Sequence, residues 1–254
     1  MIKPDLVNGG IYHLYNRGVE KRDIFLDDFD YFRFVSCLYE CNDRNYVLMR
    51  KRIDNRREKQ NQKNCVGLTH AIGNQRKREL LVDVLGFSLM TNHYHLIVRQ
   101  RVDNGIPLFA GKISNSHTGY FNNKYGRRGL GGLFQGTYKV VPIENNAQLM
   151  NLAIYVFCNP VSIFDPGWTK DEMVNPEGAI EFLNNYRWSS YPDSIGKDNF
   201  PSVTQRDVIW KIFGGSDVDF QQSKKIIKNH TENWIKSKSD YWRGITRIGN
   251  AMLD

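Results

Sequence analysis

The chain has 254 residues, of which 41% are hydrophobic and 24% charged, the proportions of an ordinary globular protein. It carries 35 Lys and Arg against 27 Asp and Glu, and this positive balance favours a polyanionic partner such as nucleic acid. No stretch is apolar for long enough to span a bilayer, and residues 1–5 lack a signal-peptide core. We therefore expect a cytoplasmic protein with no membrane partner.

Hydrophobic periodicity predicts that strands and helices alternate along the chain. Apolar residues at every second position indicate strands, and those at every third or fourth position indicate helices. The expected elements are a strand at 10–17, a helix at 25–41 capped by Asp27 or Asp28, a hairpin of strands at 81–90 and 93–100, a helix at about 106–125, a strand at 138–143 and a helix at about 146–158. This layout favours an α+β fold, in which helices pack on a sheet.

Two regions lie outside this pattern. The segment at about 45–80 concentrates Lys and Arg and is longer than a simple connection, which is typical of a solvated insertion or of a DNA-binding arm. Helices are predicted at 203–213 and 219–230. We therefore divide the chain into a core at 1–192 that contains this basic insertion, and a helical C-terminal extension at 193–254.

Two histidines begin the second strand of the predicted hairpin. His93 and His95 are two residues apart, so in a strand their side chains point to one face while Tyr94 points to the other. Two adjacent imidazoles can bind one metal ion, and metal ions commonly assist reactions at phosphates. Paired histidines also occur by chance on half-buried strands, so the pair alone leaves both interpretations open.

The helix predicted at 146–158 carries a polar stripe on an otherwise apolar sequence. The stripe consists of Gln148, Asn151, Tyr155 and Asn159, which the helical repeat places on one side. Tyr155 and Asn159 can therefore offer a phenol and an amide to the same point. A tyrosine packed in the core and an asparagine that ends the helix before Pro160 explain the same pattern without a function.

Seven short motifs extend from about residue 8 to about residue 192. They are Gly-Ile-Tyr-His at 10–13, Asn-Arg-Gly at 16–18, Ile-Phe-Leu-Asp-Asp at 24–28, Asn-His-Tyr-His-Leu-Ile-Val at 92–98, Leu-Phe-Gln-Gly-Thr-Tyr-Lys at 133–139, Tyr-Val-Phe-Cys-Asn-Pro-Val at 155–161 and Trp-Ser-Ser-Tyr at 188–191. In this order they resemble the HUH-type single-tyrosine transposases, in particular the REP-associated branch. The resemblance implies a ferredoxin-like or RRM-like core with a central antiparallel sheet.

The resemblance also implies an activity. Such enzymes cleave and rejoin single-stranded DNA near hairpins through a 5′-phosphotyrosine intermediate, with a divalent metal ion, Mg²⁺ or Mn²⁺, as cofactor. Tyr155 corresponds to the nucleophile, and His93, His95 and Asn159 correspond to the metal ligands. Tyr94 replaces a residue that is more commonly aliphatic, and strand alternation directs it away from the metal.

The expected partner is single-stranded or hairpin DNA, and either a monomer or a homodimer is compatible with the resemblance. Candidates for phosphate contacts are Arg17, Arg127, Arg128 and Lys139. Arg127 and Arg128 lie in a glycine-rich segment that lacks the Gly-Lys-Ser/Thr of a Walker loop. The sequence identifies no clear general base. His13 or Lys139 could assist deprotonation of the nucleophile, but strand packing and phosphate contact explain these residues better.

Two alternative functions remain open at this point. One is a non-catalytic protein that binds structured DNA or RNA through its basic surface, against which the intact His93, His95 and Tyr155 argue. The other is a metal hydrolase that uses activated water, with Tyr155 as a structural residue. The hydrolase predicts turnover without a covalent intermediate.

Overall fold

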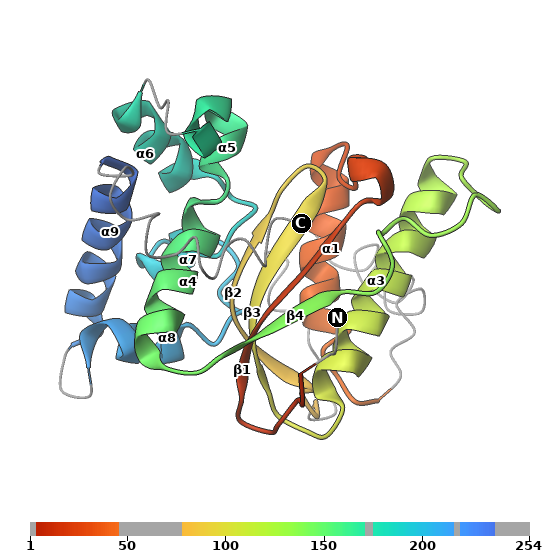
Figure 1. Ribbon diagram of the computed structural model, residues 1–254, viewed down its shortest axis with the longest axis horizontal. Helices are drawn as coiled ribbons and strands as arrows, with labels where there is room; N and C mark the ends of the chain where they lie inside the picture. Colours follow the sequence, from red (N-terminus) through yellow and green to blue (C-terminus); the bar gives the residue numbers. More distant parts are fainter. Residues whose placement is uncertain (1–3, 46–77, 171–174, 216–218, 237–254) are drawn as a thin grey trace, which may run out of the picture.

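A four-stranded antiparallel sheet forms the centre of the molecule (Figure 1). The computed structural model describes residues 4–45, 78–170, 175–215 and 219–236. The strands are β1 (Ile11–Arg17), β2 (Val82–Leu89), β3 (His93–Gln100) and β4 (Lys139–Ile143), in the order β2-β3-β1-β4 with every neighbouring pair antiparallel. The predicted α+β fold with an antiparallel sheet is confirmed.

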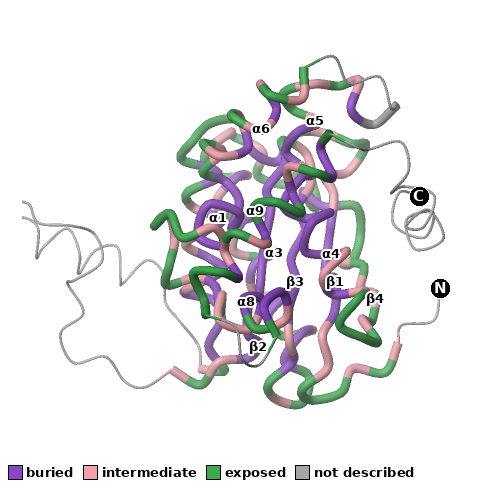
Figure 2. The backbone as a smooth tube through the Cα atoms, turned by 90° about the vertical axis from the view of Figure 1, so that its left-hand side faces the viewer, coloured by how far each residue is buried: buried purple, intermediate pink, exposed green. Residues whose placement is uncertain are grey.

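Helices cover both faces of this sheet. Helices α1 (Asp28–Glu40) and α3 (Gly105–Lys124) lie on one face, and α4 (Asn146–Cys158) lies on the other (Figure 1). Along the chain, β1, α1, β2, β3, α3 and β4 follow one another in the β-α-β-β-α-β succession of ferredoxin-like folds. Because both faces are covered, the central strands β1 and β3 are purple, meaning buried, along most of their length (Figure 2).

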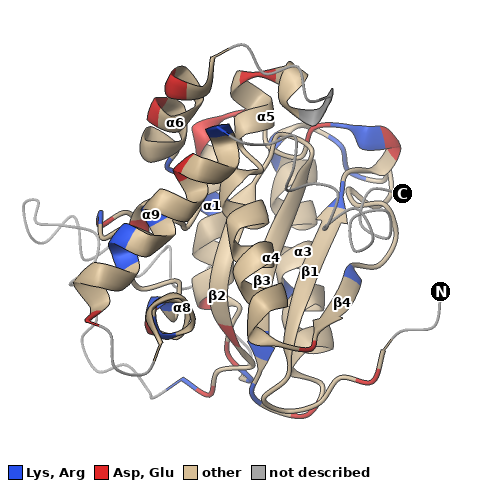
Figure 3. Ribbon diagram, turned by 60° about the vertical axis from the view of Figure 1, so that its left-hand side comes forward, with Lys and Arg blue, Asp and Glu red and all other residues tan. Residues whose placement is uncertain are grey.

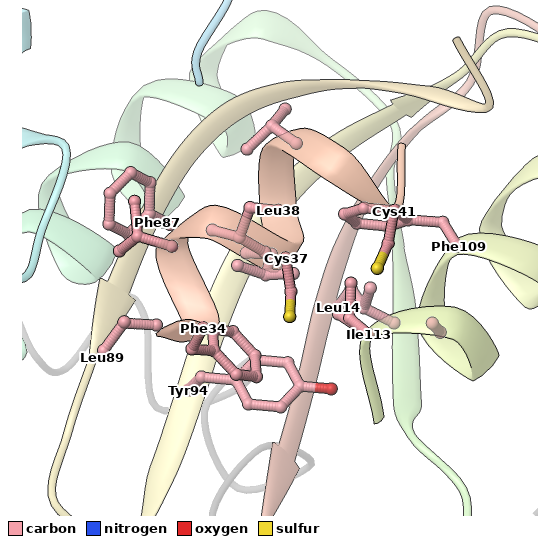
Figure 4. Packing of buried hydrophobic residues seen from close by; sticks show 14 of the residues in the cluster. Leu14, Phe34, Cys37, Leu38, Cys41, Phe87, Leu89, Tyr94, Phe109 and Ile113 are labelled. Atoms are coloured by element: carbon pink, nitrogen blue, oxygen red, sulfur yellow. The ribbon is translucent and has the colours of Figure 1, made fainter. Parts of the chain in front are cut away.

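Alternation along β3 assigns its side chains to the two faces. Tyr94, Leu96 and Val98 belong to the cluster that the sheet forms with α1 and α3, and Figure 4 shows Tyr94 beside Phe34 of α1. Ile97 belongs to the second cluster, which contains α4. The residues of odd number, including both histidines, therefore face α4.

Helix α1 begins at Asp28 because Asp27 caps it. The Asp27 side chain accepts a hydrogen bond from the backbone N–H of Asp30, 3.1 Å away, which is the usual geometry of an N-cap aspartate. The expected helix at 25–41 thus starts three residues late, while the predicted cap is confirmed for Asp27. Phe25 precedes the helix and is buried in the core.

The carboxylate of Asp30 ties α1 to α3. It is fully buried and accepts hydrogen bonds from the Leu26 N–H at 2.8 Å, the Tyr120 hydroxyl at 2.9 Å, the Tyr125 hydroxyl at 2.8 Å and the Lys124 ammonium at 2.7 Å. Burial raises the pKa of Asp30, but these donors outweigh it and hold the pKa below its usual value. The carboxylate is therefore charged and satisfied inside the protein.

The C-terminal helices extend the layer on the α4 side of the sheet. After α5 (Val161–Phe164), α6 (Pro176–Asn185) and α7 (Tyr191–Ser194), the chain forms α8 (Arg206–Gly214) and α9 (Phe220–Lys236). The last two correspond to the helices expected at 203–213 and 219–230, and they share a hydrophobic cluster with α4. Residues 46–77, most of the predicted basic insertion, lie outside the described residues.

One helical segment among the described residues, Asn146–Phe164, is long and apolar enough to cross a membrane by length and composition. In its most apolar window 56% is buried inside the protein, because α4 lies between the sheet and α8 and α9 (Figure 1). Such burial is typical of a core helix. Asn151 and Asn159 interrupt the apolar run of this segment.

Replacing Asp30 by Asn is expected to lower the free energy of unfolding by about 2–3 kcal/mol, because the buried donors lose a charged acceptor. Chemical denaturation at pH 7 measures this difference. Asp28→Asn, an exposed position in the same helical turn, serves as the control and should change stability by about 0.5 kcal/mol or less.

The difference in stability between wild type and Asp30→Asn should depend on pH. A carboxyl whose pKa is lowered by folding stabilises the protein above its unfolded-state pKa of about 4. That stabilisation is lost as the pH falls through the lower folded-state pKa. The difference between wild type and Asp30→Asn should therefore shrink in acid, and a difference that stays constant to pH 2 would contradict the assignment.

Candidate active site

Side chains of β1, β3 and α4 meet on the face of the sheet that α4 covers. In the antiparallel register of β1 and β3, Tyr15 lies opposite His95 and Arg17 lies opposite His93. His13 is two residues before Tyr15 on β1 and therefore shares its face. This pairing brings five polar side chains of two strands together beneath one helix.

Ring contacts connect the predicted nucleophile to the predicted histidines. The ring centroids of Tyr155 and His95 are 5.5 Å apart at an interplanar angle of 85°, and those of His93 and His95 are 5.0 Å apart. Tyr155 also contacts His13 edge-on at 6.2 Å. The structure thus places the ring of Tyr155 edge-on against His95 and His13.

Asn159 completes this group. It follows the last turn of α4, and its N–H donates to the Tyr155 carbonyl at 3.0 Å. Its side chain is hydrogen-bonded to both His93 and Tyr155. The four residues expected at the catalytic centre, Tyr155, His93, His95 and Asn159, therefore form one connected group. Their elements, β3 and α4, are 46 residues apart at their nearest ends, Gln100 and Asn146.

The histidines of this site are neutral at physiological pH. Burial lowers the pKa of His93 to about 4, with a further decrease from the Arg17 charge that the hydrogen bond to Asn159 partly offsets. Burial lowers the pKa of His95 well below its usual value, and it lowers that of His13 to about 3. Only the neutral form of imidazole has a lone pair for a metal ion.

The phenol of Tyr155 is protonated at physiological pH. Burial raises its pKa and the neighbouring Tyr15 raises it further, while the hydrogen bond to Asn159 and the Arg17 charge lower it. The balance lies above the usual value of 10.0. A phenol in this environment needs local assistance to become a nucleophile.

The donor set fits a divalent metal ion. The Nδ1 atom of His93 is 2.6 Å from the Asn92 side-chain oxygen, and the Nδ1 atom of His95 is 2.9 Å from Nε2 of His13. With Nδ1 of both rings engaged, a metal ion would bind at Nε2 of His93 and His95. The Asn159 side chain, which is hydrogen-bonded to His93 here, would turn its amide oxygen to the ion as a third donor. Within the described residues no group of three His, Cys, Asp or Glu side chains could hold a metal ion, so the site depends on this amide.

Two residues of β1 belong to the cluster without having been predicted there. Tyr15 is 8% exposed, and its ring stacks on His13 at 4.9 Å and on His95 at 5.9 Å. His13 was considered only as a possible proton acceptor. Alternation along residues 11–17 places His13 and Tyr15 on one face of β1. That face could be assigned to the site only with the pairing of β1 and β3, which the sequence does not give.

The four basic residues predicted to contact DNA lie at different distances from this centre. Arg17 is close enough for its charge to lower the pKa of His93 and Tyr155, and the Lys139 Nζ lies 5.9 Å from the centroid of the Tyr15 ring. Arg127 and Arg128 lie in the loop after α3, where Arg128 is hydrogen-bonded to Asn123. Figure 3 shows basic residues in the turn after β1 and near the start of β4.

One protein-family model matches part of the chain. Residues 43–157, which include His93, His95 and Tyr155, match the family model described as IS200-like transposase. This match confirms the transposase resemblance that the motifs predicted. No curated protein sequence matches the chain.

Two solved structures resemble the chain only distantly. A REP-associated tyrosine transposase bound to a REP hairpin has a TM-score of 0.45 at 11% identity, over 80% of this chain and 88% of that one. The tRNA(His) guanylyltransferase of Saccharomyces cerevisiae has a TM-score of 0.33 at 8% identity, over 92% of this chain and 79% of that one. Neither score is high enough to carry an argument, so the REP-associated branch stays a prediction.

Tyr155→Phe should lower the free energy of unfolding by about 1 kcal/mol or less, because only the hydroxyl and its hydrogen bond are lost. Tyr155→Ala should cost about 3–5 kcal/mol, because the ring is 8% exposed and its removal leaves a cavity. Thermal and denaturant unfolding of both variants test this. Equal losses would show that the ring does not pack as described.

Proposed function

We propose that this chain, a relative of the IS200-like transposases, cleaves and rejoins single-stranded DNA through a covalent bond to Tyr155. The observation that carries the proposal is the contact of the Tyr155 ring with His95, and of Asn159 with both Tyr155 and His93. A packed core has no need for neutral, desolvated imidazoles beside a buried phenol. A phosphoryl-transfer centre uses the imidazoles as metal ligands and the phenol as nucleophile.

The reaction balances without a nucleotide cofactor. The Tyr155 oxygen attacks the scissile phosphorus and the bond from phosphorus to the 3′ oxygen breaks. The phenolic proton passes to a local acceptor, and the leaving 3′ oxygen takes up a proton in exchange. The products are a 5′-phosphotyrosine and a free 3′ hydroxyl. Because the new ester conserves the energy of the broken one, a 3′ hydroxyl can reverse the attack and rejoin the strands.

The residues around Tyr155 orient and activate it. Asn159 holds the phenol by a hydrogen bond, and the positive charge of Arg17 favours its deprotonated form. The same guanidinium can bind the phosphate that Tyr155 attacks. Burial excludes water from the phosphotyrosine, which favours rejoining over hydrolysis.

His93, His95 and Asn159 would hold the metal ion. When bound, a divalent ion would polarise a non-bridging phosphate oxygen and stabilise the charge that develops on the leaving 3′ oxygen. Two imidazoles and one amide oxygen suit Mn²⁺ better than Mg²⁺, which prefers oxygen ligands. Both ions remain candidates for the cofactor.

The DNA partner would follow the basic side chains near the site. Arg17 and Lys139 would contact phosphates beside Tyr155, and Arg127 and Arg128 would contact the strand farther away. The motif resemblance to REP-associated transposases favours a hairpin next to the cleavage site.

Wild type incubated with labelled single-stranded hairpin DNAs and Mn²⁺ should form a protein-linked band on a denaturing gel, and Tyr155→Phe should form none. Tyr15→Phe is the matched control, because Tyr15 is a second phenol in the same site with the same 8% exposure. It should retain the band, since its hydroxyl is not the nucleophile.

The other outcomes identify the alternatives. Cleavage without a protein-linked band would favour a hydrolase that uses activated water. Binding without cleavage would favour a non-catalytic nucleic-acid-binding protein. A protein-linked band that is lost in Tyr15→Phe but retained in Tyr155→Phe would identify Tyr15 of β1 as the nucleophile.

His95→Ala should reduce formation of the protein-linked band by about a hundredfold or more, because loss of a metal ligand removes several kcal/mol of charge stabilisation. A chelator should have the same effect on wild type, reversed by added Mn²⁺. His117→Gln is the control: His117 is buried on the opposite face, where its Nε2 lies 2.8 Å from the Ile24 carbonyl. Equal activity of His95→Ala and wild type would refute the metal site.

A further inference from the structure

We propose that His13 is a positioning residue that accepts the Nδ1–H of His95 and thereby directs Nε2 of His95 to the metal ion. The inference rests on the proposed function and deepens it. It assigns a role to a side chain of β1 that neither the motif resemblance nor the family match explains.

The geometry of the two rings supports this role. Nε2 of His13 lies 2.9 Å from Nδ1 of His95, which is a normal hydrogen-bond length. Their ring centroids are 5.0 Å apart and their planes differ by 15°. His13 is 0% exposed and His95 is 3% exposed, so water does not compete for this contact.

The requirements of a metal ligand determine the direction of the hydrogen bond. A neutral imidazole carries one proton, and a ligand nitrogen must present a lone pair. If Nε2 of His95 binds the ion, its proton is on Nδ1 and can only be donated to Nε2 of His13. His13 then carries its own proton on Nδ1.

His93 shows the same arrangement with a different acceptor. Its Nδ1 faces the Asn92 side-chain oxygen at 2.6 Å, and the Asn92 Nδ2 group donates to the Lys21 carbonyl at 3.1 Å. That second contact identifies the atom facing His93 as the oxygen, so His93 is the donor. Both ligand histidines therefore have an acceptor behind Nδ1, the usual arrangement for histidines that bind metals.

Stability alone does not account for an imidazole at position 13. Its Nδ1 is buried and has no hydrogen-bond partner within the described part of the chain, and such an atom costs free energy. An aliphatic side chain would fill this site on a central strand without that cost. The contact of His13 Nε2 with His95 Nδ1 is the interaction that compensates for this cost.

The experiment measures binding of Mn²⁺ alone, without DNA, by the electron paramagnetic resonance signal of the free ion. His13→Leu should weaken Mn²⁺ binding by about 10–100-fold, the usual effect of losing such a partner, without lowering the melting temperature. His13→Gln should bind within about threefold of wild type, because its side-chain oxygen can accept the same hydrogen bond. His117→Leu, a buried histidine of the other face, is the matched control and should bind as wild type does.

The outcomes separate this inference from the function on which it rests. No Mn²⁺ binding by wild type would overturn both. Equal binding by wild type and His13→Leu would overturn the role of His13 alone, as would an equal loss in His13→Gln and His13→Leu.

A second readout on wild type covers the case in which the variants do not fold. In the zinc-loaded protein, ¹⁵N–¹H correlation spectra of the imidazoles should show both His95 and His13 protonated on Nδ1. A His95 without a proton on Nδ1 would overturn the proposal, because the metal ion would then occupy the position assigned to the hydrogen bond.

Discussion

The pairing of β1 with β3 is the constraint on which the site depends. It places Tyr15 opposite His95 and Arg17 opposite His93. It also brings Nε2 of His13 to 2.9 Å from Nδ1 of His95. A slip of one residue would turn these side chains toward α1 and α3 and turn Tyr12 and Leu14 toward α4. Because both faces of the sheet are buried, such a slip would place polar groups in one core and bulky apolar ones in the site.

Burial on this face has opposite consequences for the two kinds of functional group. It keeps His93 and His95 neutral, the form in which they would bind the proposed metal ion. It also raises the pKa of Tyr155, which makes the nucleophile harder to form. The hydrogen bond from Asn159 and the positive charge of Arg17 lower the pKa of Tyr155 and so oppose the effect of burial. These two residues therefore assist the proposed nucleophile.

Local features were predictable from the sequence, and contacts between distant segments were not. Periodicity predicted α4 at 146–158, where the structure has it, and β3 at 93–100. The spacing of His93 with His95, and of Tyr155 with Asn159, predicted which side chains share a face. The contacts of His13 and Tyr15 escaped prediction because they depend on which strands pair, and residues more than 75 positions apart in the chain carry no local signal of that pairing.

If Tyr155 forms the covalent bond to DNA, the attachment site of the nucleotide on the protein can be mapped directly. Wild type would be incubated with single-stranded hairpin DNA and Mn²⁺, digested with nuclease and protease, and the peptides analysed by mass spectrometry. We expect a nucleotide attached through its 5′ phosphate to Tyr155. Attachment to Tyr15 or to any other residue, or cleaved DNA with no modified peptide, would contradict it.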